Sequence, residues 1–281
     1  MSNNSSHSAS ANTVRRLCPR CGSDSSAQKA LPYGSTEWPL KACAKCEFIY
    51  LEIVPAYAAL AGELGWDKTF AAWHTERAKD RYHVLRSRLG RTVRDQLRTV
   101  FKRTTMESLL LEFAAPGNVL DVGCGKGTQL ENLPETYVPF GIEVSPEQAA
   151  HAKAAVAPRG GQIVVAPGAE ALATFPPEFF SCIIMRSYLE HESEPVRALN
   201  GAYHALASGG VLLLKVPNYG SLNRRLFGTG WCGFRFPDHV NYFTPGSLRA
   251  MVEEAGFSIR RFSMRDRWPT SDNMWMIAAR G

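Results

Sequence analysis

A glycine-rich turn between an apolar segment and a helical one constrains the fold of this chain more than any other feature. Residues 119–127 read VLDVGCGKG, so an apolar run ends at the carboxylate of Asp121 and three glycines follow at alternate positions. The apolar part predicts a buried strand, and residues 128–133 predict the start of a helix. Glycines at such a turn permit positive φ angles and let a ligand approach the backbone closely. Because ligands of open α/β sheets bind beyond the carboxyl ends of the strands, we expect a nucleotide-like ligand here.

Two other interpretations of the turn differ in the ligand that they imply. One is a tight turn with no ligand, for which three alternating glycines are unusual. The other is a nicotinamide or flavin dinucleotide site, whose fingerprint G-x-G-x-x-G would need a glycine where Thr128 stands. Glu143 ends the next apolar run, 22 residues after Asp121, which is near the spacing of a ribose-binding acid in either fold. Glu143 therefore predicts an adenosyl ligand without choosing between them.

Four of the seven cysteines occur in two C-x-x-C pairs, which are Cys18 with Cys21 and Cys43 with Cys46. The two pairs are separated by twenty-one residues. This spacing in an intracellular chain predicts a zinc ribbon rather than disulfides, and four thiolates complete a tetrahedron that has no open position. Unmetallated thiols in a loop are the alternative. Redox exchange is less favoured, because neither pair opens a helix after a strand.

The positive charge of the chain is concentrated in one segment. The net charge is +6, whereas residues 76–103 alone contain ten Lys or Arg and three Asp or Glu. Val93, Leu97 and Phe101 recur there at helical spacing, so a solvated helix face is the favoured interpretation. The alternative is a surface for an acidic partner such as nucleic acid, a nucleotide-linked sugar or an anionic membrane. No apolar run can span a bilayer and no secretion signal is found, which predicts a cytoplasmic protein.

The glycine turn resembles motif I of the class I S-adenosylmethionine-dependent methyltransferases, which reads (D/E)-x-G-x-G-x-G. Residues 186–191 (RSYLEH) are similar to the family's Leu-Glu-His run after the fourth strand, and residues 207–211 (ASGGV) to its Lys-Pro-Gly-Gly turn. Residues 237–244 (PDHVNYFT) are similar to an Arg-His-x-x-x-Phe-Thr-Pro run of a subgroup with zinc-ribbon N-termini. The resemblance implies an enzyme with S-adenosylmethionine as methyl donor.

Strands that alternate with helices predict an α/β fold with a doubly wound sheet. The resemblance implies a Rossmann-like sheet of seven strands, the last of them antiparallel, with a small N-terminal zinc ribbon and a helical linker. Residues 257–264 and 274–279 can supply the closing pair of strands. The expected regions are a disordered tail (1–14), the zinc ribbon (15–52), a helical, basic linker or cap (53–112) and the methyltransferase domain (113–281).

The resemblance also implies which residues hold the cofactor. Glu143 falls where the family binds the ribose hydroxyls, and residues 167–170 (PGAE) fall where many members have an Asp for the adenine amine. This chain has Ala169 there, so backbone groups near Ala169, or Glu170, would replace that contact. The residues expected at the cofactor are Asp121, Gly123, Cys124, Gly125, Gly127, Glu143, Val144, Ala169, Glu170 and Arg186.

Candidate catalytic residues lie after the fourth strand and in the excursion over residues 220–244. Methyl transfer from a sulfonium depends mainly on positioning, and a hydroxyl or carbon acceptor also needs its proton removed by a group poised near neutral pH. His191, just beyond the strand, is the candidate base, and Tyr188 and Glu190 of the same turn could orient it or the substrate. His239 belongs to the excursion. Either histidine could instead have only a capping or packing role.

These features leave three hypotheses for function. The leading one is a zinc-ribbon methyltransferase acting on the oxygen or carbon of a small molecule or sugar. Nucleotide-sugar C-methyltransferases resemble it, because they combine a zinc module with a Tyr-x-Glu-His turn, matched by Tyr188, Glu190 and His191; their large additional C-terminal domain is not present in these 281 residues. The second is an RNA guanine methyltransferase that binds RNA through the zinc module and residues 76–103. The third is a non-catalytic adaptor.

Overall fold

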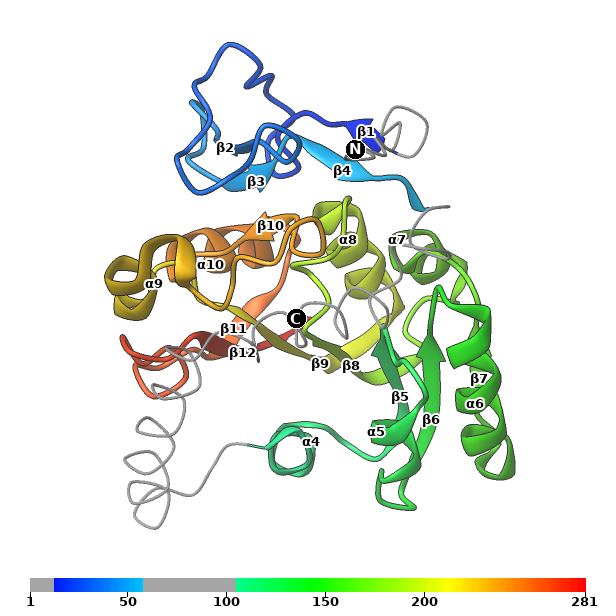
Figure 1. Ribbon diagram of the computed structural model, residues 1–281. Helices are drawn as coiled ribbons and strands as arrows, with labels where there is room; N and C mark the ends of the chain where they lie inside the picture. Colours follow the sequence, from blue (N-terminus) through cyan, green and yellow to red (C-terminus); the bar gives the residue numbers. More distant parts are fainter. Residues whose placement is uncertain (1–12, 58–104) are drawn as a thin grey trace, which may run out of the picture.

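The computed structural model of the protein describes residues 13–57 and 105–281, and it shows an α/β domain beneath a small all-β unit (Figure 1). The central sheet has the order β11-β12-β9-β8-β5-β6-β7, in which only β12 runs antiparallel to its neighbours. The predicted seven-stranded, doubly wound sheet is therefore confirmed. Its strands are β5 (Gly117–Val122), β6 (Tyr137–Ile142), β7 (Gln162–Val164), β8 (Phe180–Arg186), β9 (Leu206–Pro217), β11 (Ser258–Arg261) and β12 (Asn273–Ala279).

Apolar cores cover both faces of this sheet, because successive strand residues point to opposite sides. Val119 packs in the core with helices α4 and α6, whereas Leu120 packs in the core with α8 and α10. Figure 1 shows α4 and α10 on opposite faces of the sheet. The helices are α4 (Met106–Phe113), α5 (Thr128–Glu131), α6 (Pro146–Val156), α7 (Gly168–Ala171), α8 (Pro195–Ala205), α9 (Leu222–Phe227) and α10 (Pro245–Glu254). Three short 3₁₀ helices are η1 (Ala157–Arg159), η2 (Leu172–Thr174) and η3 (Gly228–Gly230).

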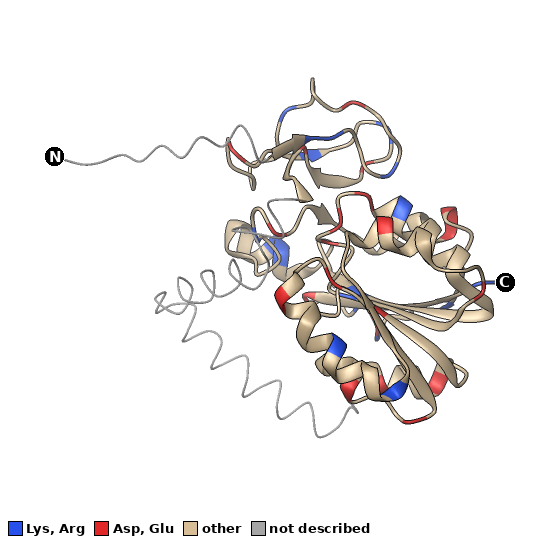
Figure 2. Cartoon of the chain, turned by 90° about the vertical axis from the view of Figure 1, so that its right-hand side faces the viewer, with Lys and Arg blue, Asp and Glu red and all other residues tan. Residues whose placement is uncertain are grey.

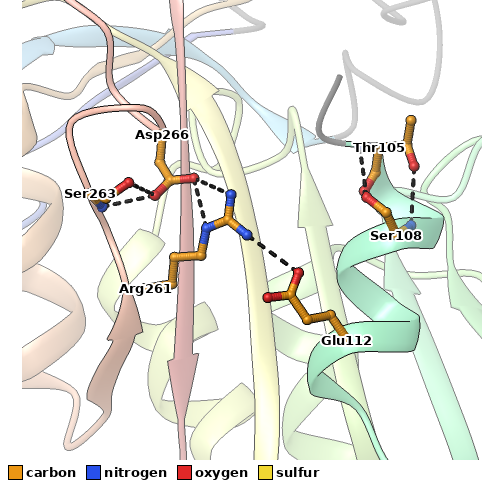
Figure 3. Close-up of polar contacts among 6 residues, drawn as sticks. All are labelled: Thr105, Ser108, Glu112, Arg261, Ser263 and Asp266. Carbon is orange, nitrogen blue, oxygen red and sulfur yellow. Dashed lines mark hydrogen bonds and ion pairs between the residues drawn. The ribbon is translucent and has the colours of Figure 1, made fainter. Parts of the chain in front are cut away.

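Helix α4, which leads into the sheet, is fastened at both ends. At its start, Thr105 and Ser108 form a capping box, in which each side chain bonds the backbone N–H of the other (Figure 3). Near its end, Glu112 accepts a 3.4 Å hydrogen bond from Arg261, whose guanidinium also binds Asp266. These contacts attach α4 to the edge of the sheet at β11.

The cysteine-rich unit shares a sheet with the methyltransferase domain. Strands β2 (Leu40–Ala42) and β3 (Ile49–Leu51) pair with each other, and β10 (Asn241–Tyr242), from the excursion after β9, pairs with β3. Leu40 and Leu51 pack against Trp231 and Tyr242 in one buried cluster. The core of the ribbon is therefore formed partly by its own residues and partly by residues of the excursion.

The limits of the predicted regions differ from the observed elements at two points. Strand β1 (Thr13–Arg15) begins inside the segment 1–14 that we expected to be a disordered tail, and it pairs with β4 (Ile53–Pro55). Strand β4 in turn lies beyond residue 52, where we expected the ribbon to end. The basic segment 76–103 lies outside the described residues. In the view of Figure 2, positions of Lys and Arg and positions of Asp and Glu are both scattered over the described part of the chain.

Candidate active site

A cavity of about 410 Å³ lies at the carboxyl ends of β5, β6 and β8, where ligands of open α/β sheets bind. Three separate parts of the chain form its wall. The end of the ribbon contributes Val54, Pro55 and Tyr57, and the excursion contributes Pro237, Asp238 and Val240. The strand ends, loops and helix α6 of the methyltransferase domain contribute the remaining residues, which are Gly123–Gly125, Ile142–Ser145, Gln148, Ala166–Gly168, Arg186–Tyr188, His191–Ser193 and Lys215.

The three glycines of the turn have two different roles. Gly123, Gly125 and Gly127 all have positive φ angles, of 75°, 56° and 79°. Gly123 and Gly125 line the cavity, and a Cβ on Gly125 would have only the Gln148 Oε1 atom, at 3.1 Å, among its near neighbours. Gly127 is buried and does not line it; a Cβ there would lie 2.9 Å from the Cα of Ala152 in α6. Gly125 thus leaves space for a ligand, a Cβ on Gly123 would lie 3.2 Å from the ring of Tyr188, and Gly127 lets α5 and α6 approach each other.

Glu143 closes this turn from the end of β6. Its Oε2 accepts a hydrogen bond from the backbone N–H of Gly125, and its Oε1 from that of Ser145, each at 2.8 Å. An ionised carboxylate offers about four acceptor positions, so two remain for hydroxyl donors of a ligand. Val144 and Ser145 line the cavity beside it. The carboxylate is therefore both fixed by the turn and able to bind a vicinal diol.

Asp121 lies behind the turn and is only 5% exposed. Burial raises the pKa of its carboxyl to about 7. The nearby carboxylate of Glu143 also raises this pKa, whereas the guanidinium of Arg186 lowers it. Asp121 does not line the cavity, and the thiol of Cys124, which does, has its pKa raised by burial. The carboxyl of Asp121 is therefore mainly neutral below pH 7, and the thiol of Cys124 stays protonated there.

The raised pKa of Asp121 predicts a pH-dependent gain in stability when the carboxyl is removed. Because the folded state keeps a proton that the unfolded chain releases above about pH 4, stability falls as the pH rises toward 7. Asp121→Asn is expected to raise the free energy of unfolding by about 1.5 kcal/mol at pH 5 and on the order of 4 kcal/mol at pH 8. Urea unfolding at both pH values measures this. An equal change at both, or a loss at pH 8, contradicts it, and the exposed Glu135→Gln is the control.

Two residues predicted to contact the adenine lie away from the cavity. Ala169 is buried in the core beneath α7, and Glu170 is exposed, so neither belongs to the wall. The preceding residues, Ala166, Pro167 and Gly168, line the cavity instead. The glycine at position 168 was the sequence signal for this part of the wall. The structure explains why it is glycine, because a Cβ there would lie 2.0 Å from the hydroxyl oxygen of Tyr188. A short turn of helix thus directs the next two side chains away.

The segment after β8 brings a carboxylate into the cavity that sequence reasoning missed. Glu192 is 2% exposed, and its two oxygens accept hydrogen bonds from the hydroxyls of Tyr57 and Tyr188. The backbone N–H of Glu194 also donates to Glu192, at 2.9 Å. Burial and the adjacent carboxylate raise the pKa of both tyrosines, so both hydroxyls keep their protons. Glu192 lies four residues after Tyr188, but nothing in the local sequence indicates its contact with Tyr57.

The four predicted catalytic residues separate into two pairs. Tyr188 and His191 line the cavity, whereas Glu190 and His239 are buried behind its wall. The Nδ1 atom of His191 lies 2.9 Å from the carbonyl oxygen of Asp238, so Nδ1 carries the proton and Nε2 does not. Burial and Arg235 lower the pKa of His191 to about 3. His191 is therefore neutral and a weak base.

The four paired cysteines converge as a metal site requires. The Sγ atoms of Cys18 and Cys46 are 3.5 Å apart, as are those of Cys21 and Cys43, and all four lie within 4.8 Å of one another. Sulfur atoms bound to one tetrahedral zinc are about 3.8 Å apart, given a Zn–S distance of about 2.3 Å. The donor set and spacing fit a zinc ion.

Arg16, next to the first cysteine pair, joins the ribbon to the cavity wall. Its guanidinium donates to the carbonyl oxygens of Leu51, Ser193 and Val240 and to Asn241 Oδ1. Asn241 in turn donates to the carbonyl oxygens of Leu189, at 2.7 Å, and Glu192, at 2.6 Å. Ribbon, excursion and the segment after β8 are therefore connected through one set of polar contacts, and a change in the ribbon reaches the cavity.

Comparisons with known proteins agree with this geometry. Residues 92–261, more than half of the chain, match the family described as "Methyltransferase domain". A methyltransferase structure from Clostridium acetobutylicum covers 62% of this chain and 88% of its own, at 12% identity and a TM-score of 0.51. A chain from the complex of the Haloferax volcanii Trm112 methyltransferase activator with a methyltransferase covers 66% and 92%, at 16% identity and a TM-score of 0.50. None of the curated proteins matches the chain.

Across residues 13–57 and 105–281, no helix has both the length and the apolar character needed to cross a membrane. The predicted sheet is present, the glycine turn stands at its ligand-binding end, and the family match covers the turn and every strand of the sheet except β12. The chain is an enzyme of this methyltransferase family, and its sheet is that of the class I S-adenosylmethionine-dependent methyltransferases.

Proposed function

We propose that this enzyme methylates an oxygen or carbon atom of a small molecule, which can be a sugar, inside the described cavity. The observation that carries the proposal is that one cavity is lined by Gly125 and Glu143 on one side and by Glu192 and the ribbon residue Tyr57 on another. A volume of about 410 Å³ lies within the range of small-molecule sites. Bound S-adenosylmethionine would supply the electrophilic methyl group of its sulfonium.

We propose that the cofactor is held at the glycine turn. Gly125 leaves room for it, and the free acceptor positions of Glu143 suit the ribose hydroxyls. The backbone of Ala166–Gly168 takes the place of the adenine contacts expected from Ala169 and Glu170. Arg186, at the end of β8, lines the same cavity and offers a cation for the carboxylate of the cofactor. These contacts position the donor, on which in-line transfer depends.

We propose that Glu192 binds the acceptor group and takes its proton. Tyr57, Tyr188 and the backbone of Glu194 use three of its roughly four acceptor positions, which leaves one for a substrate hydroxyl. His191, our candidate base from the sequence, has a pKa of about 3, far below the range in which a general base works best.

The test is a methyl-label transfer assay on small molecules, RNA and protein from cell fractions. The wild-type enzyme is expected to label small molecules, and Glu192→Gln is expected to lower the rate by roughly 100-fold, the lower range for a lost general base. Calorimetric affinity for S-adenosylmethionine should change much less than the rate, because among the described residues the hydrogen bonds of Glu192 go to Tyr57, Tyr188 and Glu194 and those of Glu143 to Gly125 and Ser145. Glu194→Gln, at an exposed carboxylate, is the matched control. Label confined to RNA, or an unchanged rate in Glu192→Gln, contradicts the proposal.

We also propose that Cys18, Cys21, Cys43 and Cys46 hold a structural zinc ion. Their thiolates would fill all four positions of a tetrahedral ion, so the metal takes no part in methyl transfer. The pairing of β3 with β10 and the contacts of Arg16 support an indirect role, in which the ribbon keeps Val54, Pro55 and Tyr57 at the cavity.

A further inference from the structure

A second cluster of metal-ligating side chains lies behind the cavity wall. Glu190, His191 and His239 each bring one ligand atom to within 4.8 Å of the other two. The first two follow β8, and the third comes from the excursion. The backbone holds the two segments together, because the N–H groups of Val240 and Asn241 both donate to the carbonyl oxygen of Glu190, at 2.7 and 3.1 Å. The cluster is thus assembled by the fold and not by a local turn.

The hydrogen bonds of both histidines leave the Nε2 atom of each ring able to bind a metal ion. His191 Nδ1 donates to the carbonyl oxygen of Asp238 at 2.9 Å, and His239 Nδ1 donates to that of Gly233 at 2.8 Å. A carbonyl can only accept, so both protons are on Nδ1 and both Nε2 atoms carry a lone pair. A histidine that binds a metal through one nitrogen commonly donates its other N–H to such a carbonyl, which fixes the ring orientation. The two rings are nearly perpendicular, with centroids 4.8 Å apart.

Glu190 provides an independent observation. It is 1% exposed, and its Oε2 has no hydrogen-bond partner among residues 13–57 and 105–281. A buried oxygen without a partner costs free energy that a coordinated cation would recover. The nearby positive groups are Arg235, which is paired with Asp238 at 2.8 Å, and Lys215. The charge of Arg235 is therefore largely matched by a carboxylate outside the cluster.

We propose that Glu190, His191 and His239 bind a divalent transition-metal ion at a site separate from the four cysteines. Two imidazole nitrogens and one carboxylate oxygen suit zinc, iron or cobalt, whereas magnesium and calcium prefer oxygen ligands alone. Ligand atoms bound to one tetrahedral ion are about 3.4 Å apart, given bonds of about 2.1 Å. Rotations of the three side chains would bring their ligand atoms, now within 4.8 Å of one another, to this separation. The ion fastens the excursion to the segment after β8 and sets the position of His191 in the cavity wall.

The full-length protein, purified with its tightly bound metal and dialysed to remove weakly held ions, is titrated with Co²⁺ and examined by native mass spectrometry. The wild type is expected to carry two ions per chain, one of them Co²⁺ with a visible spectrum of nitrogen and oxygen ligands and no thiolate charge-transfer band. Glu190→Gln and His239→Gln are each expected to weaken Co²⁺ binding by at least ~100-fold, as loss of a ligand should exceed the effect of losing an outer-shell partner. His204→Gln, at an exposed histidine of α8, is expected to bind Co²⁺ as the wild type does.

Two results would overturn this proposal. The first is a wild-type protein in which saturating Co²⁺ gives no ion with the spectrum of nitrogen and oxygen ligands, which is decisive even if the variants do not fold. The second is a second ion whose affinity is the same in Glu190→Gln and in His204→Gln, since that ion would be bound elsewhere. The readout is metal binding and requires no acceptor, so it does not depend on the proposed methyl-transfer reaction.

Discussion

Replacing Gly125 by arginine is expected to abolish binding of S-adenosylmethionine to a protein that still folds. Gly125 lines the cavity with a φ of 56°, and a side chain attached there would extend into the space beside Glu143. A left-handed conformation costs a residue other than glycine only roughly 1–2 kcal/mol, which most domains tolerate. Steric exclusion of the ligand is far larger, so we expect a loss of at least ~1000-fold in affinity, or about 4 kcal/mol. Isothermal titration calorimetry measures it.

Gly160→Arg is the matched control for this experiment. Gly160 also has a positive φ, of 73°, and a Cβ there would meet no atom within 4 Å, but it follows η1 and does not line the cavity. The two variants should lose similar amounts of stability in thermal unfolding, while only Gly125→Arg loses the cofactor. Unchanged affinity in Gly125→Arg would show that the cofactor does not bind at this turn.

The second large effect is expected when the cysteine cluster loses one ligand. Cys43→Ser should remove about one equivalent of zinc per chain, because a structural site depends on all four thiolates. Metal binding and folding are coupled in such small modules, so the ribbon should lose its structure. With it the pairing of β3 with β10 is lost, together with the wall residues Val54, Pro55 and Tyr57. We expect methyl transfer to fall by ~100-fold or more, as Tyr57 and Glu192 separate.

The effect on the cofactor separates this result from general unfolding. Affinity for S-adenosylmethionine should change much less than the transfer rate, because Gly125 and Glu143 follow strands β5 and β6 of the main sheet, outside the ribbon. Cys232→Ser, which alters a cysteine outside the cluster, should keep its zinc and its activity. A Cys43→Ser protein without zinc that unfolds at the wild-type temperature and transfers methyl groups normally would contradict a structural role for the ribbon.

Much of the fold could be predicted because it depends on local chemistry. The apolar runs ending at Asp121 and Glu143 predict buried strands, and Ser145 followed by Pro146 predicts the start of α6, where Ser145 accepts a hydrogen bond from the N–H of Gln148. The alternate glycines satisfy a backbone requirement for positive φ that few other residues meet. These requirements lie within a few residues of one another, so a short segment of sequence contains them in full.

Side-chain direction near the site could not be predicted in the same way. Glu190 and His191 are neighbours in the chain, yet the first is buried behind the wall and the second lines the cavity. Ala169 and Glu170 follow Gly168 directly and both point away from the cavity that Gly168 lines. A shift of one position on a turn reverses which side chain faces a ligand, and packing against distant segments determines that shift.

The sequence by itself determined the alternation of strands and helices, the glycine turn with its adjacent carboxylates, and the two cysteine pairs, since each follows from residue type and short spacing; the number and order of the strands came from the resemblance to the family. Only the tertiary structure decided that Tyr57 meets Glu192, that β10 completes the ribbon sheet, and that His239 lies beside Glu190. The partners are 135 residues apart for Tyr57 and Glu192, and 49 apart for Glu190 and His239. Such contacts depend on how separate elements pack, because burial of shared apolar surface, and not local conformation, brings them together.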